Sequence, residues 1–171
     1  HGESKTRLYK VWAGMKSRCN NPKCKFYKYY GGRGISVCKE WADSFLAFRD
    51  WALSHGYKDD LQIDRKNNNG GYSPSNCRFV TRSQNQINRR IPKGSSSKYR
   101  GVCWFKNYKK WKASITINGK PKFLGYFKKA IDAATAYDNA ARQLHGEYAK
   151  FNFPSPKTAS VEFSELSENC S

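Results

Sequence analysis

The sequence has few acidic residues and no long apolar run. Its 171 residues include 13 Asp and Glu against 32 Lys and Arg, which gives a formal net charge of +19. No stretch approaches the roughly 18 apolar residues that a membrane-spanning helix needs, and no charged-then-apolar signal segment opens the chain. We therefore expect a soluble, intracellular protein with no membrane partner. The excess positive charge predicts a polyanionic partner, and nucleic-acid phosphates are the commonest one.

Side chains that commonly bind metals are also sparse. The sequence has 6 Cys but no C-x-x-C pair, and the closest spacing, from Cys19 to Cys24, is wider than the usual zinc knuckle. Because the rest of the chain has an intracellular character, we expect free thiols rather than disulfides, with a zinc site as the alternative. The 3 histidines are His1, His55 and His145, so few side chains can act as a base near neutral pH.

Aromatic residues are abundant by contrast. The 10 Phe, 11 Tyr and 5 Trp can bury enough surface for small cores, which argues against disorder throughout. The Pro, Gly and Ser residues within residues 91–98 resist helix and strand and predict a flexible linker. We therefore predict a first domain over residues 1–90, a second over residues 99–154 and a tail over residues 155–171.

The charge is divided between the two predicted domains. Residues 1–90 hold 18 Lys and Arg with 7 Asp and Glu, residues 91–153 hold 13 with 3, and residues 154–171 hold 1 with 3. Both domains are basic and the tail is not, so we expect two separate phosphate-binding surfaces.

Local patterns in the first domain predict helices followed by a ββα unit. The expected elements are helices over residues 7–19 and 41–54, strands over residues 61–65 and 76–81, and a closing helix over residues 82–90. Three glycines within residues 31–34 predict a break in any helix, with either a positive φ or a close approach of the backbone.

An ordered set of motifs lies within this unit. Ile-Asp-Arg-Lys-Asn-Asn-Asn at residues 63–69 is followed by Ser-Asn-Cys-Arg-Phe-Val-Thr at residues 75–81 and Gln-Asn-Gln at residues 84–86. With Tyr-Tyr-Gly-Gly-Arg-Gly-Ile at residues 29–35, this order resembles the HNH, or ββα-metal, nucleases, and in particular phage-encoded homing endonucleases. The resemblance covers roughly residues 1–90 and implies a metal-dependent HNH-type DNA endonuclease.

The resemblance implies roles for particular residues. Asp64 and Asn85 would bind Mg²⁺ or Mn²⁺ through oxygen atoms, and Asn76 would hold the loop through hydrogen bonds to the backbone. Arg65 stands where the family carries its catalytic His, and a guanidinium cannot act as a base near neutral pH, so it would instead clamp a phosphate. His1 is then the first candidate for the base. His55, His145 and the tyrosines near the glycine block rank lower.

A simpler explanation exists for the same residues taken one at a time. Asp64 could pair with a neighbouring arginine, and the asparagines could satisfy turns. The ordered pattern favours the nuclease interpretation over this alternative.

The second domain contains five separated sequence blocks. They are Tyr-Arg-Gly-Val from residue 99, Trp-Lys-Ala-Ser-Ile from residue 111, Leu-Gly-Tyr-Phe from residue 124, the alanine-rich run at residues 133–141, and Asn-Phe-Pro from residue 152. In this order and spacing they resemble the AP2/ERF DNA-binding domain over its whole length. Local patterns agree, with strands expected over residues 99–104, 111–117 and 122–127, an Asn-Gly hairpin turn, and a helix over residues 128–144.

In that family one face of the sheet enters the major groove of DNA. The residues expected on this face are Arg100, Lys106, Lys110, Trp111, Ser114, Thr116 and Lys122, while Leu124, Phe127 and Phe153 are expected in the core. Arg33 and Arg78 are the DNA contacts expected from the first domain. Lysines that replace family arginines predict weak base readout and strong salt dependence. A merely solvated lysine face is the alternative.

The sequence as a whole predicts an α+β protein: helical segments leading into a ββα-metal unit, a linker, and a three-stranded antiparallel sheet packed on one helix. Its expected function is that of a site-recognising homing endonuclease acting on double-stranded DNA as a monomer, with no small-molecule substrate. The expected location is the cytoplasm of a phage-infected or bacterial host cell. A catalytically inactive DNA-binding regulator is the main alternative, and an RNA-processing nuclease is a weaker one.

Overall fold

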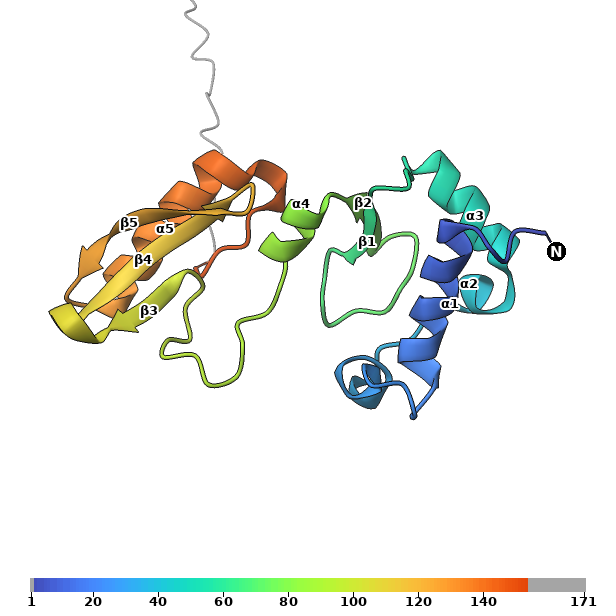
Figure 1. Cartoon of the computed structure of the whole chain (residues 1–171), viewed down its shortest axis with the longest axis horizontal. Helices are drawn as coiled ribbons and strands as arrows, with labels where there is room; N and C mark the ends of the chain where they lie inside the picture. The colour runs from blue at the N-terminus through green and yellow to red at the C-terminus, as the bar shows by residue number, and fades with distance from the viewer. Residues whose placement is uncertain (1, 154–171) are drawn as a thin grey trace, which may run out of the picture.

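The computed structural model describes residues 2–153, which form two lobes (Figure 1). The first contains helices α1 (Arg7–Asn20), α2 (Lys39–Asp43), α3 (Phe45–Ser54) and α4 (Arg82–Ile87) and strands β1 (Gln62–Arg65) and β2 (Cys77–Val80). The second contains strands β3 (Val102–Phe105), β4 (Lys110–Ile117) and β5 (Lys120–Phe127) and helix α5 (Ala130–His145). Short 3-10 turns lie at Tyr27–Tyr29, Gly31–Arg33, Lys106–Tyr108 and Gly146–Tyr148. The expected mixture of helix and sheet is confirmed, while His1 and the predicted tail lie outside the described residues.

Aromatic side chains form the core of the first lobe. Trp41 and Phe48 are fully buried, with ring centroids 5.2 Å apart in an edge-to-face arrangement. The Ser44 hydroxyl accepts a hydrogen bond from the N–H of Ala47 at 3.2 Å. A side chain that caps backbone N–H groups in this way favours the start of a helix. The single helix expected over residues 41–54 is therefore divided into α2 and α3.

The glycine block lets the chain approach α1 closely. A Cβ atom at Gly31 would lie 1.9 Å from the carbonyl oxygen of Cys19, so no larger residue fits there without a backbone shift. Gly34 has a φ of +78°, a left-handed conformation that glycine adopts without steric cost. The expected close approach after the first helix is observed.

Strands β1 and β2 form an antiparallel pair in which Asp64 lies opposite Arg78. Helix α4 follows directly and begins with a capping box, in which Thr81 and Gln84 each accept from the other's backbone N–H. The helix ends at Ile87, three residues before the expected end. The order strand, strand, helix agrees with the sequence prediction, but this order alone identifies no nuclease.

The second lobe is an antiparallel sheet in the order β3-β4-β5, covered on one face by α5 (Figure 1). Asn118 and Gly119, with φ values of +49° and +80°, form the turn between β4 and β5. Buried alanines of α5, among them Ala133 and Ala134, pack against Ala113 of β4. Small side chains allow helix and sheet to approach closely. This lobe confirms the expected three-stranded sheet on one helix.

A buried carboxylate forms hydrogen bonds with the last described residues of the second lobe. Asp138, which is 1% exposed, accepts hydrogen bonds from the backbone N–H groups of Asn152 and Phe153 at 2.8 and 2.9 Å. The side-chain amide of Asn152 also donates to it at 3.1 Å. The carboxylate is thus fully hydrogen-bonded, which offsets the cost of burying its charge.

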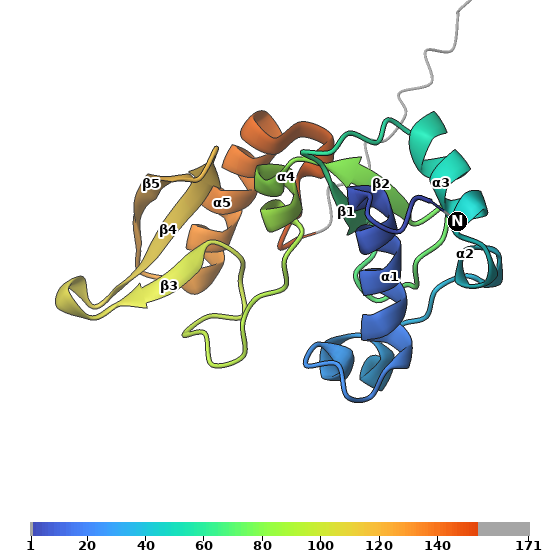
Figure 2. The same ribbon diagram turned by 45° about the vertical axis from the view of Figure 1, so that its right-hand side comes forward.

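The two lobes contact each other directly (Figure 2). Nη1 of Arg100 donates to the last carbonyl oxygen of α4 at 3.0 Å, and Nζ of Lys150 donates to the carbonyl oxygen of Lys66 at 2.9 Å. The guanidinium of Arg78 lies 4.5 Å from the ring centroid of Tyr148. These non-covalent contacts hold the lobes together in addition to the connecting segment of the chain.

The connecting segment, residues 91–98, contains neither helix nor strand. Its last part nevertheless makes contacts: Ser96 Oγ accepts from the N–H of Trp104 at 2.9 Å, and the buried Ser97 accepts from the N–H of Tyr99 at 3.0 Å. The domain boundaries themselves stay a prediction. Within the described part of the chain, no helix is long and apolar enough to span a membrane.

Candidate nucleic-acid interface

Strand β4 alternates between core and solvent, and this alternation defines the outer face of the sheet, which points away from α5. Trp111, Ala113 and Ile115 belong to the core clusters beneath α5. Successive side chains of a strand point to opposite faces. The residues of β4 on the outer face are therefore Lys110, Lys112, Ser114 and Thr116.

Four aromatic side chains gather on this outer face, and we call them the outer aromatic cluster: Phe105, Tyr108, Phe123 and Tyr126. The ring centroid of Tyr126 lies 5.3 Å from that of Phe105, 4.8 Å from that of Tyr108 and 4.8 Å from that of Phe123. Tyr108 and Phe123 are 60% and 52% exposed. Nζ of Lys112 lies 6.0 Å from the rings of both Phe105 and Phe123. Exposed rings beside ammonium groups can contact bases while the charge binds phosphate.

Sequence reasoning did not find the outer aromatic cluster. Counting outward from the Asn118-Gly119 turn pairs Ser114 with Phe123, and that pairing is observed. A register shift between Ala113 and Ser114 then changes the pairing of the rest of β5. The position of the turn therefore indicates that Phe123 lies on the outer face. The β-bulge that places Tyr126 on the same face gives no signal in the sequence.

Two residues expected on the DNA-contacting face lie elsewhere. Trp111 is partly buried on the helix side, with its ring centroid 5.1 Å from that of Trp104. Lys122 pairs with the buried Ile115 and therefore also points to the helix side, although it is exposed. Lys106 lies in the exposed turn before β4. The outer face thus carries fewer of the expected contact residues and more aromatic residues than the sequence predicted.

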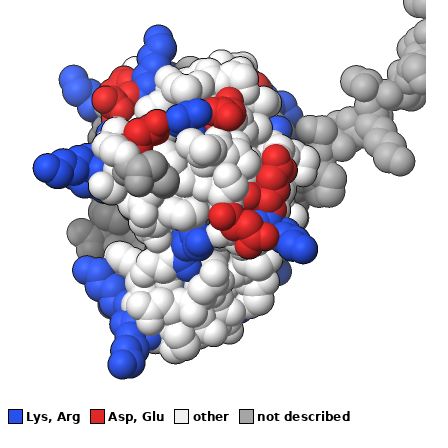
Figure 3. Space-filling model, turned by 90° about the vertical axis from the view of Figure 1, so that its right-hand side faces the viewer, with Lys and Arg blue, Asp and Glu red and all other residues white. Residues whose placement is uncertain are grey.

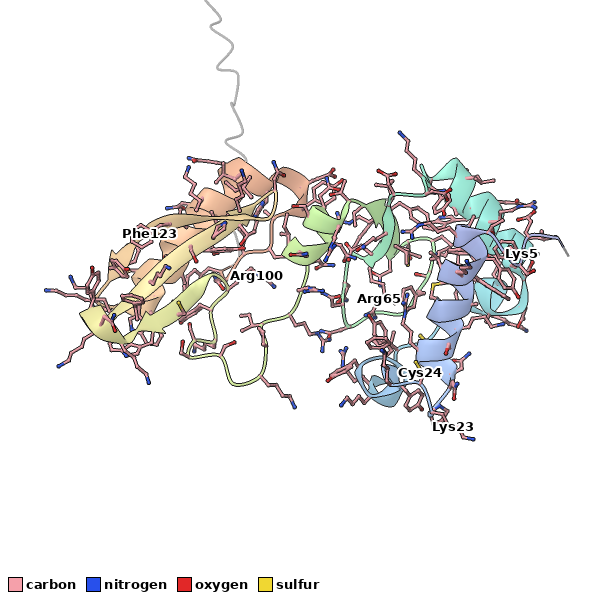
Figure 4. The ribbon with its side chains drawn as sticks, viewed as in Figure 1. Lys5, Lys23, Cys24, Arg65, Arg100 and Phe123 are labelled. Atoms are coloured by element: carbon pink, nitrogen blue, oxygen red, sulfur yellow. The ribbon has the colours of Figure 1, made fainter. Side chains whose placement is uncertain are left out.

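Arg100 lies where the second lobe meets the first (Figure 4). A cavity of about 540 Å³ opens beside it, lined by Ser114 and Thr116 of β4 and by Arg82 and Gln86 of α4. This end of β4 extends past β3 and faces α4. The expected contacts Arg100, Ser114 and Thr116 therefore border the junction between the lobes.

Asp64 is the centre of a buried polar network in the first lobe. It is 4% exposed, and its Oδ2 accepts from Nε of Arg78 at 3.1 Å. Its Oδ1 accepts from Nδ2 of Asn88 at 2.8 Å, and the same amide donates to the carbonyl oxygen of Arg65 at 2.6 Å. The simpler alternative for Asp64, pairing with a neighbouring arginine, is what the structure shows. Arg78, expected as a DNA contact, is held by this ion pair.

The expected metal ligands Asp64 and Asn85 line one pocket of about 290 Å³ together with Arg65. Both oxygens of Asp64 accept hydrogen bonds from protein groups, and the amide of Asn85 donates to Oε1 of Gln62 at 2.8 Å. Across residues 2–153, no group of three or more His, Cys, Asp or Glu side chains is placed to hold a metal ion. These residue types do not include amide oxygens such as that of Asn85, so Mg²⁺ or Mn²⁺ binding at Asp64 and Asn85 stays a prediction.

Arg65 is buried rather than presented to solvent (Figure 4). Its Nη1 donates to the carbonyl oxygen of Gly70 at 2.6 Å, and its guanidinium lies 5.1 Å and 4.9 Å from the rings of Tyr30 and Tyr72. Burial raises the pKa of Tyr72 far above its ordinary value, so this tyrosine is not a base near neutral pH. Arg65 therefore orders the loop after β1, and its expected role as a phosphate clamp stays a prediction.

Amide side chains shape the loop between β1 and β2. Oδ1 of Asn76 accepts from the N–H of Asn67 at 2.9 Å, and its Nδ2 donates to the carbonyl oxygen of Gly71 at 2.7 Å. Nη2 of Arg33 donates to Oδ1 of Asn69 at 3.1 Å. Arg33, expected as a DNA contact, is an exposed residue tied to this loop.

The candidate bases have structural surroundings of their own. His1 lies outside the described residues. Nδ1 of His55 lies 2.9 Å from the carbonyl oxygen of Trp51 at the end of α3. Burial lowers the pKa of His145, which favours its neutral form. The described cysteines are free thiols, as expected: Cys19, Cys24, Cys38, Cys77 and Cys103.

Acidic side chains lie at the end of the first lobe that is remote from the second. Figure 3 views this end, where red Asp and Glu side chains lie among blue Lys and Arg. The acidic residues of α2, α3 and the loop that follows are Glu40, Asp43, Asp50, Asp59 and Asp60. Carboxylates repel phosphates, so this end is disfavoured as a nucleic-acid interface.

Comparisons with known proteins point to the second lobe. Over 65 residues the chain is 43% identical to AP2-like ethylene-responsive transcription factor TOE2 of Arabidopsis thaliana, covering 38% of this chain and 13% of that protein. The same identity over 65 residues, or 15% of the relative, holds for APETALA2-like protein 2 of Oryza sativa subsp. indica. Dehydration-responsive element-binding protein 2A of the same organism is 41% identical over 69 residues, 39% of this chain and 25% of that protein. The chain thus spans a quarter or less of these relatives, and no family model matches it.

These findings correct the enzyme prediction. One of these relatives is named as a transcription factor and another as a response-element-binding protein, and none of the three is named as a nuclease, which contradicts a metal-dependent HNH-type endonuclease. The relatives are plant proteins, so the comparisons also give no support to a phage-infected host. They do support similarity of the C-terminal part of this chain to AP2/ERF DNA-binding domains.

Proposed function

We propose that the protein is a DNA-binding regulator whose second lobe binds double-stranded DNA through the outer face of the β3-β4-β5 sheet. The observation that carries this proposal is the outer aromatic cluster beside Lys110 and Lys112, on the lobe that is similar to AP2/ERF domains. We expect a monomer to be sufficient for binding.

The chemistry of the outer face suits a duplex groove. Lysine ammonium groups bind phosphates as point charges, which supplies affinity without sequence information. Exposed rings such as Phe123 can make apolar contacts with the methyl group of thymine, which lies in the major groove. Sequence preference therefore comes mainly from these apolar contacts, and affinity mainly from charge.

The direct test compares two exposed apolar residues. A duplex ligand is first selected from a random library with the whole chain, and its affinity is measured by fluorescence anisotropy. Phe123→Ala is expected to weaken binding by about tenfold, the range of a lost base contact. Leu53→Ala is the matched control, because Leu53 is 60% exposed on α3 and far along the chain from the sheet. Equal effects of the two substitutions would contradict the proposal.

Competition separates DNA from RNA as the ligand. The deep, narrow major groove of A-form RNA does not admit side chains. Unlabelled duplex DNA is therefore expected to displace the selected ligand at far lower concentration than duplex RNA of the same sequence. Equal competition would favour an RNA-binding role instead.

A further inference from the structure

A hollow of about 300 Å³ lies between the lobes and is lined by basic and amide side chains from both. The lining residues are Lys66, Asn67, Asn68, Asn69, Asn88, Arg90, Arg100 and Lys150. Four of these carry positive charge and none is acidic. We call Lys66, Arg90, Arg100 and Lys150 the interlobe cations.

The first lobe supplies a hydrogen-bonded scaffold for this hollow. Nδ2 of Asn68 donates to the carbonyl oxygen of Asn88 and, at 3.2 Å, to its Oδ1. Nη2 of Arg90 donates to Oδ1 of Asn69 and, at 3.3 Å, to the carbonyl oxygen of Asn68. The same Asn69 oxygen accepts from Arg33. The asparagine loop thus holds two guanidinium groups side by side.

The second lobe contributes the other two groups to the same hollow. Lys150 reaches the carbonyl oxygen of Lys66 at 2.9 Å, and Arg100 reaches the end of α4 at 3.0 Å. These acceptors are neutral backbone oxygens. In the described part of the chain, carboxylates pair only with Arg49 and Arg78, so the interlobe cations have no acidic partner there.

Four like charges held together without a carboxylate repel one another, and an anion relieves that repulsion. Arg33, which shares the Asn69 oxygen with Arg90, has its pKa lowered by burial first and then by the charges of Arg90 and Arg65. A phosphate group matches this arrangement, because guanidinium forks bind its oxygens in pairs and ammonium groups add point charges.

We propose that the interlobe cations bind a backbone phosphate of the same DNA that the outer sheet face contacts, which rests on the proposed function. The site is composite, because neither lobe alone supplies more than two of its four charges. Phosphate binding there stabilises the contact between the lobes and extends the DNA footprint from the second lobe onto the first.

The test is the salt dependence of binding to the selected duplex. Each phosphate contact on B-DNA adds about 0.9 to the slope of log K against log salt concentration. Arg90→Ala with Lys150→Ala is expected to lower the magnitude of that slope by about 0.9, because the proposed site binds one phosphate. Lys39→Ala with Lys58→Ala removes the same charge from the acidic end of the first lobe and is expected to leave the slope unchanged.

The outcomes separate this inference from the proposed function. An unchanged slope in Arg90→Ala/Lys150→Ala, with binding still lost in Phe123→Ala, would overturn the interlobe site alone. No duplex binding by the unmodified chain would overturn both. If the double variant melts at a lower temperature, Lys66→Gln replaces it, because Lys66 is exposed and, among residues 2–153, its Nζ donates only to the carbonyl oxygen of Ser75, at 3.2 Å. A slope reduced by about 0.9 in Lys66→Gln supports the site, and an unchanged slope refutes it.

Discussion

At the residue scale, the neighbours of Asp64 decide what this carboxylate does. An acidic residue at the end of a strand, before an asparagine-rich loop, matches a metal ligand in sequence. In space its two oxygens accept hydrogen bonds from Arg78 and Asn88. Asn88 is 24 residues further along the chain, and no local pattern indicates this pairing. Asp64 therefore joins β1, β2 and the segment after α4.

Removal of Asp64 tests this structural role. Asp64→Ala leaves the Arg78 guanidinium and the Asn88 amide without their acceptor, and breaking such a buried pair costs about 3 kcal/mol. The free energy of unfolding, measured in urea, is expected to fall by that amount. Asp60→Ala, which removes an exposed carboxylate nearby in sequence, is expected to change it by less than about 0.5 kcal/mol. Equal stability of both variants would show that the network contributes nothing.

The buried thiol of Cys77 predicts a pH dependence of stability. Burial raises the pKa of Cys77 from 9.0 to about 12. Above pH 9 the unfolded chain loses this proton while the folded chain keeps it, so stability falls as the pH rises from 9 towards 12. Cys77→Ala is expected to lose less stability than the unmodified chain across this window. Parallel curves for the two proteins would contradict the assignment.

At the element scale, close approaches of the backbone fix how helices and sheet pack. A Cβ atom at Gly101 would lie 2.0 Å from Cδ2 of Tyr137, and Gly101 has a φ of +71°. Gly14 lies within α1, and a Cβ atom there would meet nothing within 4 Å. The same substitution is therefore expected to have opposite effects at the two positions.

Gly101→Ala is expected to destabilise the protein by about 1 to 3 kcal/mol, because it combines overpacking against α5 with a left-handed backbone. Gly14→Ala is expected to stabilise it by up to about 1 kcal/mol, the helix-propensity difference between the two residues. Thermal unfolding followed by circular dichroism measures both shifts. A stabilising effect at position 101 would show that the packing of β3 against α5 is looser than described.

Sequence patterns predicted most of the elements but not all of their details. The Asn118-Gly119 turn and the alanine stripe of α5 are local signals, and both matched the structure. The division between α2 and α3 follows from one hydroxyl, at Ser44, within a continuous amphipathic pattern. The side on which Lys122 lies could have been predicted, because counting outward from the Asn118-Gly119 turn pairs Lys122 with Ile115.

At the scale of the whole molecule, part of the basic charge of both lobes lies at the junction between them. Arg100 and Lys150 of the second lobe donate to backbone oxygens of the first, beside Arg90. The sequence predicted that both halves are basic, because charge is counted without a structure. It could not predict that their cations line one hollow, since that depends on how the lobes pack.

Binding of duplex DNA by the outer face of the sheet is tested by comparing two double variants. Lys110→Ala with Lys112→Ala removes two charges beside the outer aromatic cluster, whereas Lys39→Ala with Lys58→Ala removes two charges from the acidic end. The measurement is the dissociation constant of each double variant for the selected duplex at one fixed salt concentration. The account predicts a loss of about tenfold or more for the sheet variant and less than about threefold for the control. Equal losses for the two variants would contradict it.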